Sequence, residues 1–266
     1  MNTVIGIDKT GSYRVYAACC GDEIAKAESI HQSSNPAFGM AITAAGIMGL
    51  MLTADGDKLS LIFKGDAEEG VRPDEIVATA NAKGTVKAYI SSDSIKLKGG
   101  SLTVIKDLGL KEPYIGKTEL ESGDISQDLA KYFALSEQQP SAVALAPNGG
   151  FIVQVLPDAD DEVLTKLEDT LFMLDSVALL IEDAEGDPAK LTELIFKDDV
   201  RILEERDIKW QCDCSRDRMK DALISLGKKE LSQIIEEDGQ AELTCQFCRT
   251  TYLFDKEELT ELMKNA

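Results

Sequence analysis

The sequence is poor in histidine: His31 is the only one among 266 residues. A hydrolytic triad needs a histidine beside its nucleophile, and many catalytic metal sites bind their ion through several histidines. His31 has no second histidine and no triad-like companion in the sequence. The chain therefore lacks the residues that a triad hydrolase or a histidine-ligated metalloenzyme needs. We expect a structural or surface role for His31, and we do not expect the protein to be an enzyme.

Basic residues are also scarce. The chain has 28 lysines and arginines against 48 acidic residues, a formal net charge of -20 and only 6% aromatic residues. Nucleic acids and anionic lipid surfaces are bound largely through clustered lysine and arginine, so this composition argues against both as partners. The glycines around residues 99 and 149 are not followed by the lysine of a Walker-type phosphate loop, so ATP is not an expected ligand.

The N-terminus lacks a secretory signal, because MNTVIGIDKTGSYR has neither a basic segment nor a long apolar run. We therefore expect the protein in the reducing cytoplasm. Residues 36–54 contain no charged side chain and are about long enough to span a bilayer. Their glycines and threonines, and the acidic Asp55 and Asp57 beyond them, favour the buried central helix of a globular domain instead of a membrane span.

The sequence does have enough apolar residues, 44% of the chain, to bury a core. Its charge is uneven. Residues 1–156 carry 19 acidic and 14 basic groups, residues 157–211 carry 17 and 6, and residues 212–266 carry 12 and 8. We therefore predict an N-terminal domain, an acidic linker with over half of the excess negative charge, and a C-terminal domain with these bounds.

The N-terminal domain is expected to be an α+β domain with antiparallel sheets, because strand-like runs outnumber helices. Alternating residues predict a hairpin of Tyr13–Cys20 with Glu23–Ile30, followed by a helix that Asn35 caps and Pro36 begins. A second hairpin is expected on either side of the turn at residues 148–150. Further predicted strands are Leu59–Phe63, Glu75–Asn81, Thr85–Ile90 and Leu102–Asp107, and residues 124–135 have helical spacing.

Apolar residues recur at helical spacing in the linker, but its short acidic helices need a neighbour to be stable. In the C-terminal domain we expect a helix from Ser215 to Leu226, a second short helix and two strands. A terminal helix follows, with Asp255 and Glu258 forming its capping box.

The strongest chemical signal is a pair of cysteine motifs, C-x-C at Cys212 and Cys214 and C-x-x-C at Cys245 and Cys248. Two such pairs can present four thiolates tetrahedrally to one zinc ion. Four protein ligands leave no open coordination position, so the predicted site is structural or redox-active, not a Lewis acid catalyst. The other two cysteines, at positions 19 and 20, should point to opposite faces of a strand and serve packing.

Zinc would keep the four sulfurs as thiolates, which is the form that oxidants attack. Two cysteines with one or two residues between them can bring their sulfurs within disulfide range after metal loss, so oxidation could eject the metal. Zinc contributes on the order of 10–16 kcal/mol in small zinc domains, whereas whole domains are stable by only about 5–15 kcal/mol. Losing zinc should therefore unfold the C-terminal domain, which makes the site a switch.

The cysteine motifs together with their surroundings resemble the family of heat-shock protein thirty-three, a redox-regulated holdase chaperone. The likeness covers most of the chain. It is carried by CDCSRDRMKDALISLGKKEL, TCQFCRTTYLFDKEEL, SYRVYAA, ANAKGTVKAYI, SLTVIKDLGLKEPYIGKTEL, DISQDLAKYFALSEQQPSAVALA and GGFIVQVLP. The sequence departs from the family pattern at Lys98–Ser101, an altered version of a glycine-rich stretch, and at the neighbouring Cys19 and Cys20, which are not part of that pattern.

The resemblance implies that the reduced protein is a zinc-bound, inactive monomer and that oxidants form two disulfides, Cys212 with Cys214 and Cys245 with Cys248. Zinc then leaves, the zinc domain and the linker unfold, and dimers form. Their exposed apolar surface would hold unfolding client proteins without ATP and protect them from aggregation under oxidative stress.

Two other functions fit parts of the sequence. A thiol-disulfide oxidoreductase would use Cys245 and Cys248, but such a motif normally opens a helix, and a strand-like run follows here. A zinc ribbon could instead bind a protein partner, while the net negative charge of residues 212–266 argues against nucleic acid.

Overall fold

The computed structural model describes residues 1–67 and 70–265, which form two units, Met1–Gln211 (unit 1) and Cys212–Ala266 (unit 2). Each unit has its own apolar core. The acidic segment 157–211 is part of unit 1 and is in contact with both of its sheets. The predicted α+β class with antiparallel sheets is confirmed.

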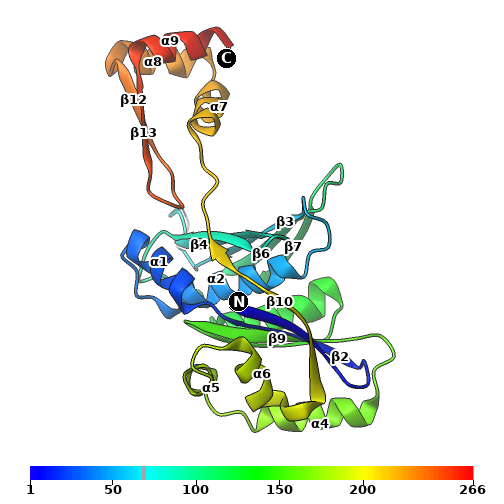
Figure 1. The fold of residues 1–266 in the computed structure, drawn as a ribbon. Coiled ribbons are helices and arrows are strands. Elements are labelled where there is room, and N and C mark those ends of the chain that lie inside the picture. The colour runs from blue at the N-terminus through cyan, green and yellow to red at the C-terminus, as the bar shows by residue number, and fades with distance from the viewer. Residues whose placement is uncertain (68–69, 266) are drawn as a thin grey trace. The chain divides into compact units, whose positions relative to one another are not determined.

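Two sheets form the framework of unit 1 (Figure 1). The first has the order β10-β1-β2-β9-β8 and is antiparallel throughout. Its strands are β1 (Thr3–Asp8), β2 (Tyr13–Cys19), β8 (Ser141–Ala146), β9 (Gly149–Val155) and β10 (Val200–Arg206). The second has the order β11-β5-β4-β3-β6-β7 and is antiparallel except where β11 pairs with β5. Its strands are β3 (Lys58–Lys64), β4 (Glu75–Asn81), β5 (Thr85–Ile90), β6 (Ser101–Asp107), β7 (Tyr114–Glu119) and β11 (Lys209–Trp210).

The uncharged stretch forms α2 (Pro36–Leu50), which packs against strands of both sheets. The Asn35 side chain accepts a hydrogen bond from the Ala37 amide, and Pro36 occupies the first turn, as predicted. Most of the helix is buried all round, because it fills the space between two apolar sheet faces. Within the part of the chain that the structure describes, no helix is long and apolar enough to cross a membrane.

The opposite face of the first sheet is covered by α4 (Asp161–Phe172), α5 (Val177–Asp183) and α6 (Pro188–Phe196). Their apolar sides form a second core with β2 and β9, while their acidic sides face solvent. The first sheet is therefore packed on both faces, by α2 on one and by these three helices on the other. The helix expected near residue 124 is α3 (Ile125–Tyr132), continued by the π-helical turn η1 (Phe133–Glu137).

The predicted strand Glu23–Ile30 is wrong, because these residues lie in α1 (Gly21–His31). Ile24 and Ala27 are the buried residues of this helix, and their spacing of three is helical. Strands β1, β7 and β10 and helix α5 were not anticipated. The edge strand β10 is mostly exposed and shows no apolar alternation, which removes the usual sequence signal.

Unit 2 contains α7 (Arg216–Leu226), α8 (Lys228–Glu237), β12 (Gln240–Thr244), β13 (Thr251–Asp255) and α9 (Lys256–Asn265). Ser215 caps α7 by accepting a hydrogen bond from the Arg218 amide. The predicted capping box of α9 is confirmed: Asp255 accepts from the Glu258 amide at 2.9 Å, and Glu258 accepts from the Asp255 amide at 3.2 Å. The core of this unit is small, with six buried residues: Leu223, Leu231, Ala241, Phe254, Leu259 and Leu262.

Candidate metal centre

The four cysteines of the two motifs lie on two loops of unit 2. Cys212 and Cys214 precede α7, and Cys245 and Cys248 lie in the turn between β12 and β13. The strand register ends at the pair Thr244 and Thr251, and the turn closes through hydrogen bonds that hold Cys245 at both its amide and its carbonyl. The hairpin therefore fixes one pair of sulfurs, and the loop before α7 brings the other pair to it.

All four sulfur atoms lie within 4.8 Å of one another, and none forms a disulfide. Two contacts join the motifs: Cys212 Sγ to Cys245 Sγ at 3.7 Å and Cys214 Sγ to Cys248 Sγ at 3.3 Å. A tetrahedron with Zn–S bonds of about 2.3 Å has sulfurs about 3.8 Å apart. The sulfur positions thus fit one four-coordinate ion of the zinc type with little movement.

Two hydroxyl groups border the cluster. The Tyr252 hydroxyl lies 3.2 Å from Cys214 Sγ, and the Thr250 hydroxyl lies 3.2 Å from Cys248 Sγ. In its thiol form Cys248 donates to the Thr250 oxygen, whereas toward a thiolate sulfur a hydroxyl group can donate, which stabilises the charge and orients a metal ligand. Neither hydroxyl residue was predicted from the sequence. Cys248 lies in a turn and Arg249 has a φ of 60°, so strand alternation does not relate Cys248 to Thr250 and Tyr252.

The thiols differ in acidity. Burial raises the pKa of Cys212 and of Cys214 above the ordinary thiol range. Burial also opposes ionisation of Cys248, but hydrogen bonds to the Thr250 side chain and amide outweigh it and lower the pKa of Cys248 to about 6. Three of the cysteines are half-buried and only Cys245 is buried, so small oxidants have access to the cluster.

Ionic contacts hold the loops that carry the cysteines. The Arg216 guanidinium donates to both Glu258 carboxylate oxygens at 2.7 Å and to the Leu253 carbonyl at 2.8 Å, and it lies 4.4 Å from the centre of the Phe254 ring. These contacts tie the start of α7 to β13 and α9. Arg218 forms an ion pair at 2.6 Å with Asp213, the residue between the first two cysteines.

The remaining candidates from the sequence lie in unit 1. Cys19 and Cys20 are both buried, Cys19 in the core under α4–α6 and Cys20 in the core around α2, so the prediction of opposite faces is confirmed. Burial raises the pKa of Cys19 to about 12 and that of Cys20 to about 11, which keeps both thiols protonated near neutral pH. His31 contacts the Phe38 ring edge-on at 5.5 Å, a packing role.

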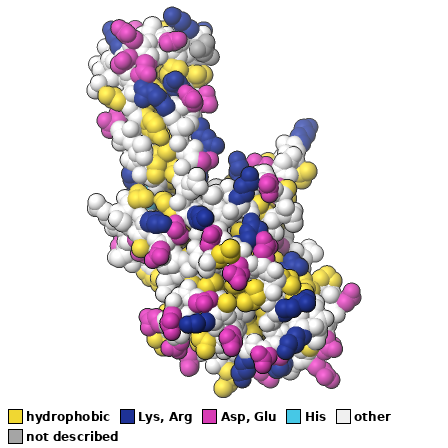
Figure 2. All heavy atoms as spheres, viewed as in Figure 1, with side chains coloured by type: hydrophobic (Ala, Val, Ile, Leu, Met, Phe, Trp, Pro, Cys, Tyr) yellow, Lys and Arg dark blue, Asp and Glu magenta, His cyan; other side chains and the backbone are white. Residues whose placement is uncertain are grey.

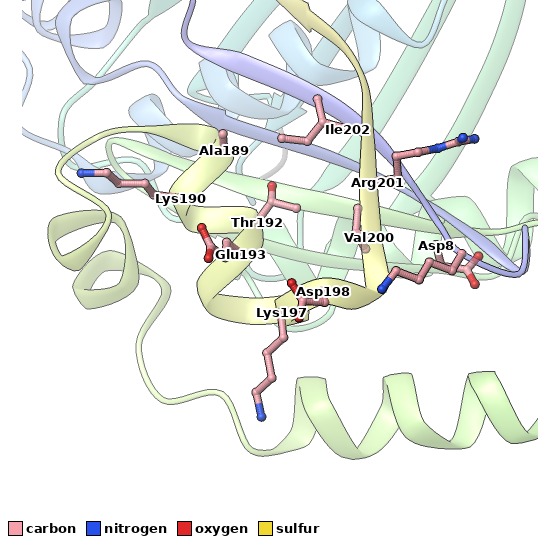
Figure 3. A pocket seen from close by; sticks show the side chains of 11 residues that line it. Asp8, Ala189, Lys190, Thr192, Glu193, Lys197, Asp198, Val200, Arg201 and Ile202 are labelled. Carbon is pink, nitrogen blue, oxygen red and sulfur yellow. The ribbon is translucent and has the colours of Figure 1, made fainter.

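A cavity of about 670 Å³ lies beside α6, β10 and the end of β1. Lys190, Lys197 and Arg201 line it, but in Figure 3 their charged ends point in three different directions. Acidic groups, among them Glu193 and Asp198, stand between them. The cavity has no convergent set of polar groups, so it is not a competing catalytic site.

The C-x-x-C motif does not lead into a helix. Cys248 is followed by β13, and the hairpin partner β12 precedes Cys245. Motifs of thiol-disulfide oxidoreductases sit at a helix N-terminus, where the helix dipole stabilises the attacking thiolate. The geometry therefore disfavours the oxidoreductase hypothesis.

Comparisons with known proteins agree with the cysteine geometry. The family model described as Hsp33 protein matches residues 2–255. The chain is 40% identical to a 33 kDa chaperonin of Alkaliphilus oremlandii, over 98% of this chain and 96% of that protein. It is 37% identical to a 33 kDa chaperonin of Clostridioides difficile, over 96% of this chain and 95% of that protein. A crystal structure of the 33 kDa chaperonin of Thermotoga maritima matches with a TM-score of 0.84 at 29% identity, covering 100% of this chain and 99% of that one. The chain therefore belongs to the Hsp33 family.

Proposed function

We propose that this protein is a redox-regulated holdase, a chaperone that binds unfolding client proteins without ATP and prevents their aggregation. One observation carries the proposal: four unlinked cysteine sulfurs lie within 4.8 Å of one another in a unit with its own small core. Membership of a family whose relatives are named 33 kDa chaperonins supports the chaperone part.

In the reduced protein, Cys212, Cys214, Cys245 and Cys248 would hold one zinc ion. Bound zinc supplies charge that keeps the four sulfurs ionised and joined, and with no open position it supplies no catalysis. Tyr252 and Thr250 would orient two of the sulfurs by hydrogen bonding.

Oxidation would convert these thiolates to disulfides, Cys212 with Cys214 and Cys245 with Cys248. With hydrogen peroxide as oxidant, each pair of thiolates gives up two electrons, and peroxide takes them with two protons to form two waters. The contacts at 3.7 and 3.3 Å join sulfurs of different motifs, and the proposed pairing would replace them with S–S bonds of about 2.05 Å within each motif.

We assign residues 157–211 as the segment that loosens when unit 2 loses its order. The whole segment has 17 acidic and 6 basic residues, and its helices α4–α6 cover apolar residues of the first sheet, among them Val15, Phe151 and Val153. Like-charge repulsion favours their release and keeps the opened protein soluble. Apolar surface uncovered in this way would bind clients and support dimers.

The surface charge is in keeping with client proteins as partners and not nucleic acid. On the face shown in Figure 2, lysines and arginines are interspersed with acidic side chains, and apolar side chains lie among them. Phosphate backbones are bound by continuous basic surfaces, which the described residues do not form on this face.

The proposal is tested by oxidising the reduced protein with peroxide at elevated temperature. Zinc release is followed with a chromogenic chelator, and aggregation of a thermally unfolding client is followed by light scattering. We expect zinc release to coincide with suppression of aggregation. Zinc release without any suppression would contradict the chaperone function, and catalytic turnover of disulfides would favour an oxidoreductase.

A further inference from the structure

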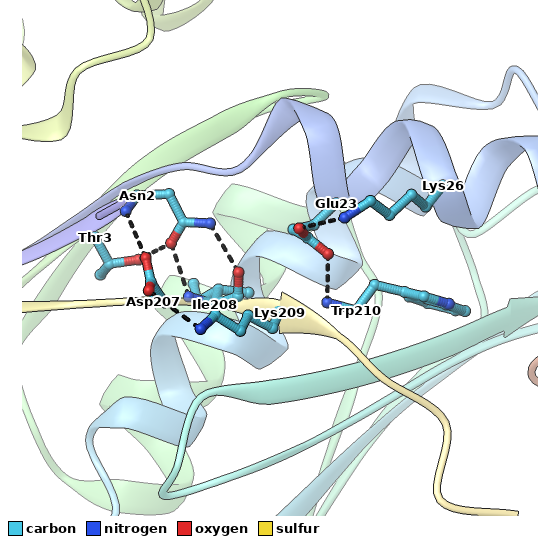
Figure 4. Close-up of polar contacts among 8 residues, drawn as sticks. All are labelled: Asn2, Thr3, Glu23, Lys26, Asp207, Ile208, Lys209 and Trp210. Atoms are coloured by element: carbon cyan, nitrogen blue, oxygen red, sulfur yellow. Dashed lines mark hydrogen bonds and ion pairs between the residues drawn. The ribbon is translucent and has the colours of Figure 1, made fainter.

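Residues 207–211, here called the strap, lie along the outer edge of β5 at the end of unit 1 (Figure 4). The Lys209 amide donates to the Gly84 carbonyl at 2.8 Å, and the Gln211 amide donates to the Val86 carbonyl at 2.9 Å. The strap strand β11 is only two residues long, and it takes the end position of the second sheet next to β5. If the strap left, β5 would be an edge strand with open hydrogen-bonding groups.

Two polar side chains of unit 1 hold the main chain of the strap. Asn2 accepts from the Ile208 amide at 2.7 Å and donates to the Ile208 carbonyl at 2.7 Å. Glu23 accepts from the Trp210 amide at 2.6 Å. With the two bonds to residues Gly84 and Val86, five main-chain groups of residues 208–211 are hydrogen-bonded to the rest of unit 1. Every polypeptide carries such groups, so most of the polar recognition does not depend on sequence.

The strap also inserts alternate apolar side chains. Ile208 is fully buried, and a Cβ added at Gly46 of α2 would lie 2.7 Å from its Cδ1 atom, so this glycine makes room for it. Trp210 is half-buried against the core between the two sheets, whereas Lys209 between them is exposed. The site therefore accepts apolar residues at every second position of an extended chain.

We propose that the outer edge of β5, with Asn2, Glu23 and the hollow over Gly46, is a binding site for an extended, alternately apolar segment of an unfolded protein. In the structure the strap occupies this site in the place of such a segment. The inference rests on the proposed holdase function and names a client-binding surface for it. Cys212 follows Gln211 directly, so loss of order in unit 2 frees the C-terminal end of the strap. Addition of a strand to an open sheet edge is an established mode of peptide recognition, in which main-chain bonds give affinity and alternate side chains give specificity.

The test uses the full chain and a fluorescent peptide that copies residues 205–211, Glu-Arg-Asp-Ile-Lys-Trp-Gln, with binding measured by anisotropy. We expect the oxidised protein to bind the peptide, and the reduced, zinc-loaded protein to bind it at least about tenfold more weakly because the tethered strap competes. N-methylation at the lysine and glutamine of the peptide, or aspartate in place of its isoleucine, should each weaken binding by about tenfold or more. N-methylation at its first residue, which has no counterpart on β5, is the matched control and should change little.

A protein variant tests the same site from the other side. Ile208→Asp should release the strap and allow the reduced protein to bind the peptide, whereas Ile202→Asp, at a 38% exposed position on β10, should not. If Ile208→Asp fails to fold, the comparison of normal and N-methylated peptides on the natural protein still tests the site.

The outcomes separate the inference from the function on which it rests. An oxidised protein that suppresses aggregation but binds the normal and the N-methylated peptides equally, or binds neither, overturns the β5 site and leaves the holdase function standing. A dimer whose second copy donates its strap to β5 and excludes the peptide also overturns it. An oxidised protein that does not suppress aggregation contradicts the holdase function itself.

Discussion

Removing the zinc ion that we propose for the four cysteines should unfold unit 2 and leave unit 1 folded. The core of unit 2 has six buried apolar residues, whereas unit 1 has two larger clusters. The cysteine-bearing loops before α7 and between β12 and β13 meet at their sulfur atoms, which lie within 4.8 Å of one another without a disulfide. A structural zinc site contributes about 10–16 kcal/mol, which equals or exceeds the roughly 5–15 kcal/mol that stabilises a whole domain. We therefore expect a negative free energy of unfolding for metal-free unit 2.

The assay is amide hydrogen exchange with and without a chelator under reducing conditions. Amides of β12 and β13 should lose their protection, and amides of β4 and α2 should keep it. Cys245→Ser should reproduce the effect, while Cys19→Ala, which removes a buried thiol outside the cluster, should bind zinc as the unaltered protein does and leave unit 2 protected. Full protection of unit 2 after complete metal removal would contradict this prediction, because the apolar core alone would then hold unit 2 folded.

Three further predictions concern other parts of the structure. Tyr252→Phe removes the hydroxyl beside Cys214 and should lower zinc affinity about tenfold in chelator competition; equal affinities would show that the contact is unimportant. Burial raises the folded-state pKa of Cys19 to about 12 and of Cys20 to about 11 from a reference of 9.0, so their contribution to the stability of unit 1 is complete below about pH 9 and is lost as the pH rises through the folded values. The melting temperature of unit 1 should therefore fall more steeply between pH 8 and 11 for the natural protein than for a Cys19→Ala, Cys20→Ala double variant. Equal pH dependence of the two melting temperatures would contradict this. Asp128 is a buried carboxylate that accepts hydrogen bonds from the amides of residues 121–123. Asp128→Asn should lower the free energy of unfolding of unit 1 by about 2 kcal/mol in urea titrations. An unchanged urea midpoint would show that these hydrogen bonds do not stabilise unit 1.

Local signals in the sequence were sufficient where one interaction dominates a segment. Asn35 and Pro36 predict the start of α2 because a side-chain cap and a fixed φ act within a few residues. The capping box of Asp255 and Glu258 likewise lies within one turn. The two cysteine motifs predicted a cluster, and the structure brings their sulfurs together.

Structure that depends on distant partners was not predictable in this way. In α1, the apolar residues Ile24 and Ala27 are too few to separate helix from strand by pattern alone. Strand β10 is exposed and exists because it pairs with β1, almost 200 positions earlier in the chain. Asn2 and Glu23 bind main-chain groups of the strap that lie 206 and 187 positions later in the chain. No local sequence pattern can therefore identify these two residues.

The proposed coupling of disulfide formation, zinc release and chaperone activity can be measured in one peroxide titration of the reduced protein. Three quantities are read from each sample: zinc released, thiols lost and client aggregation. We expect one zinc ion to leave as four thiols disappear, and suppression of aggregation to rise in the same proportion. Suppression that is complete while zinc is still bound, or zinc that leaves without suppression, would contradict it.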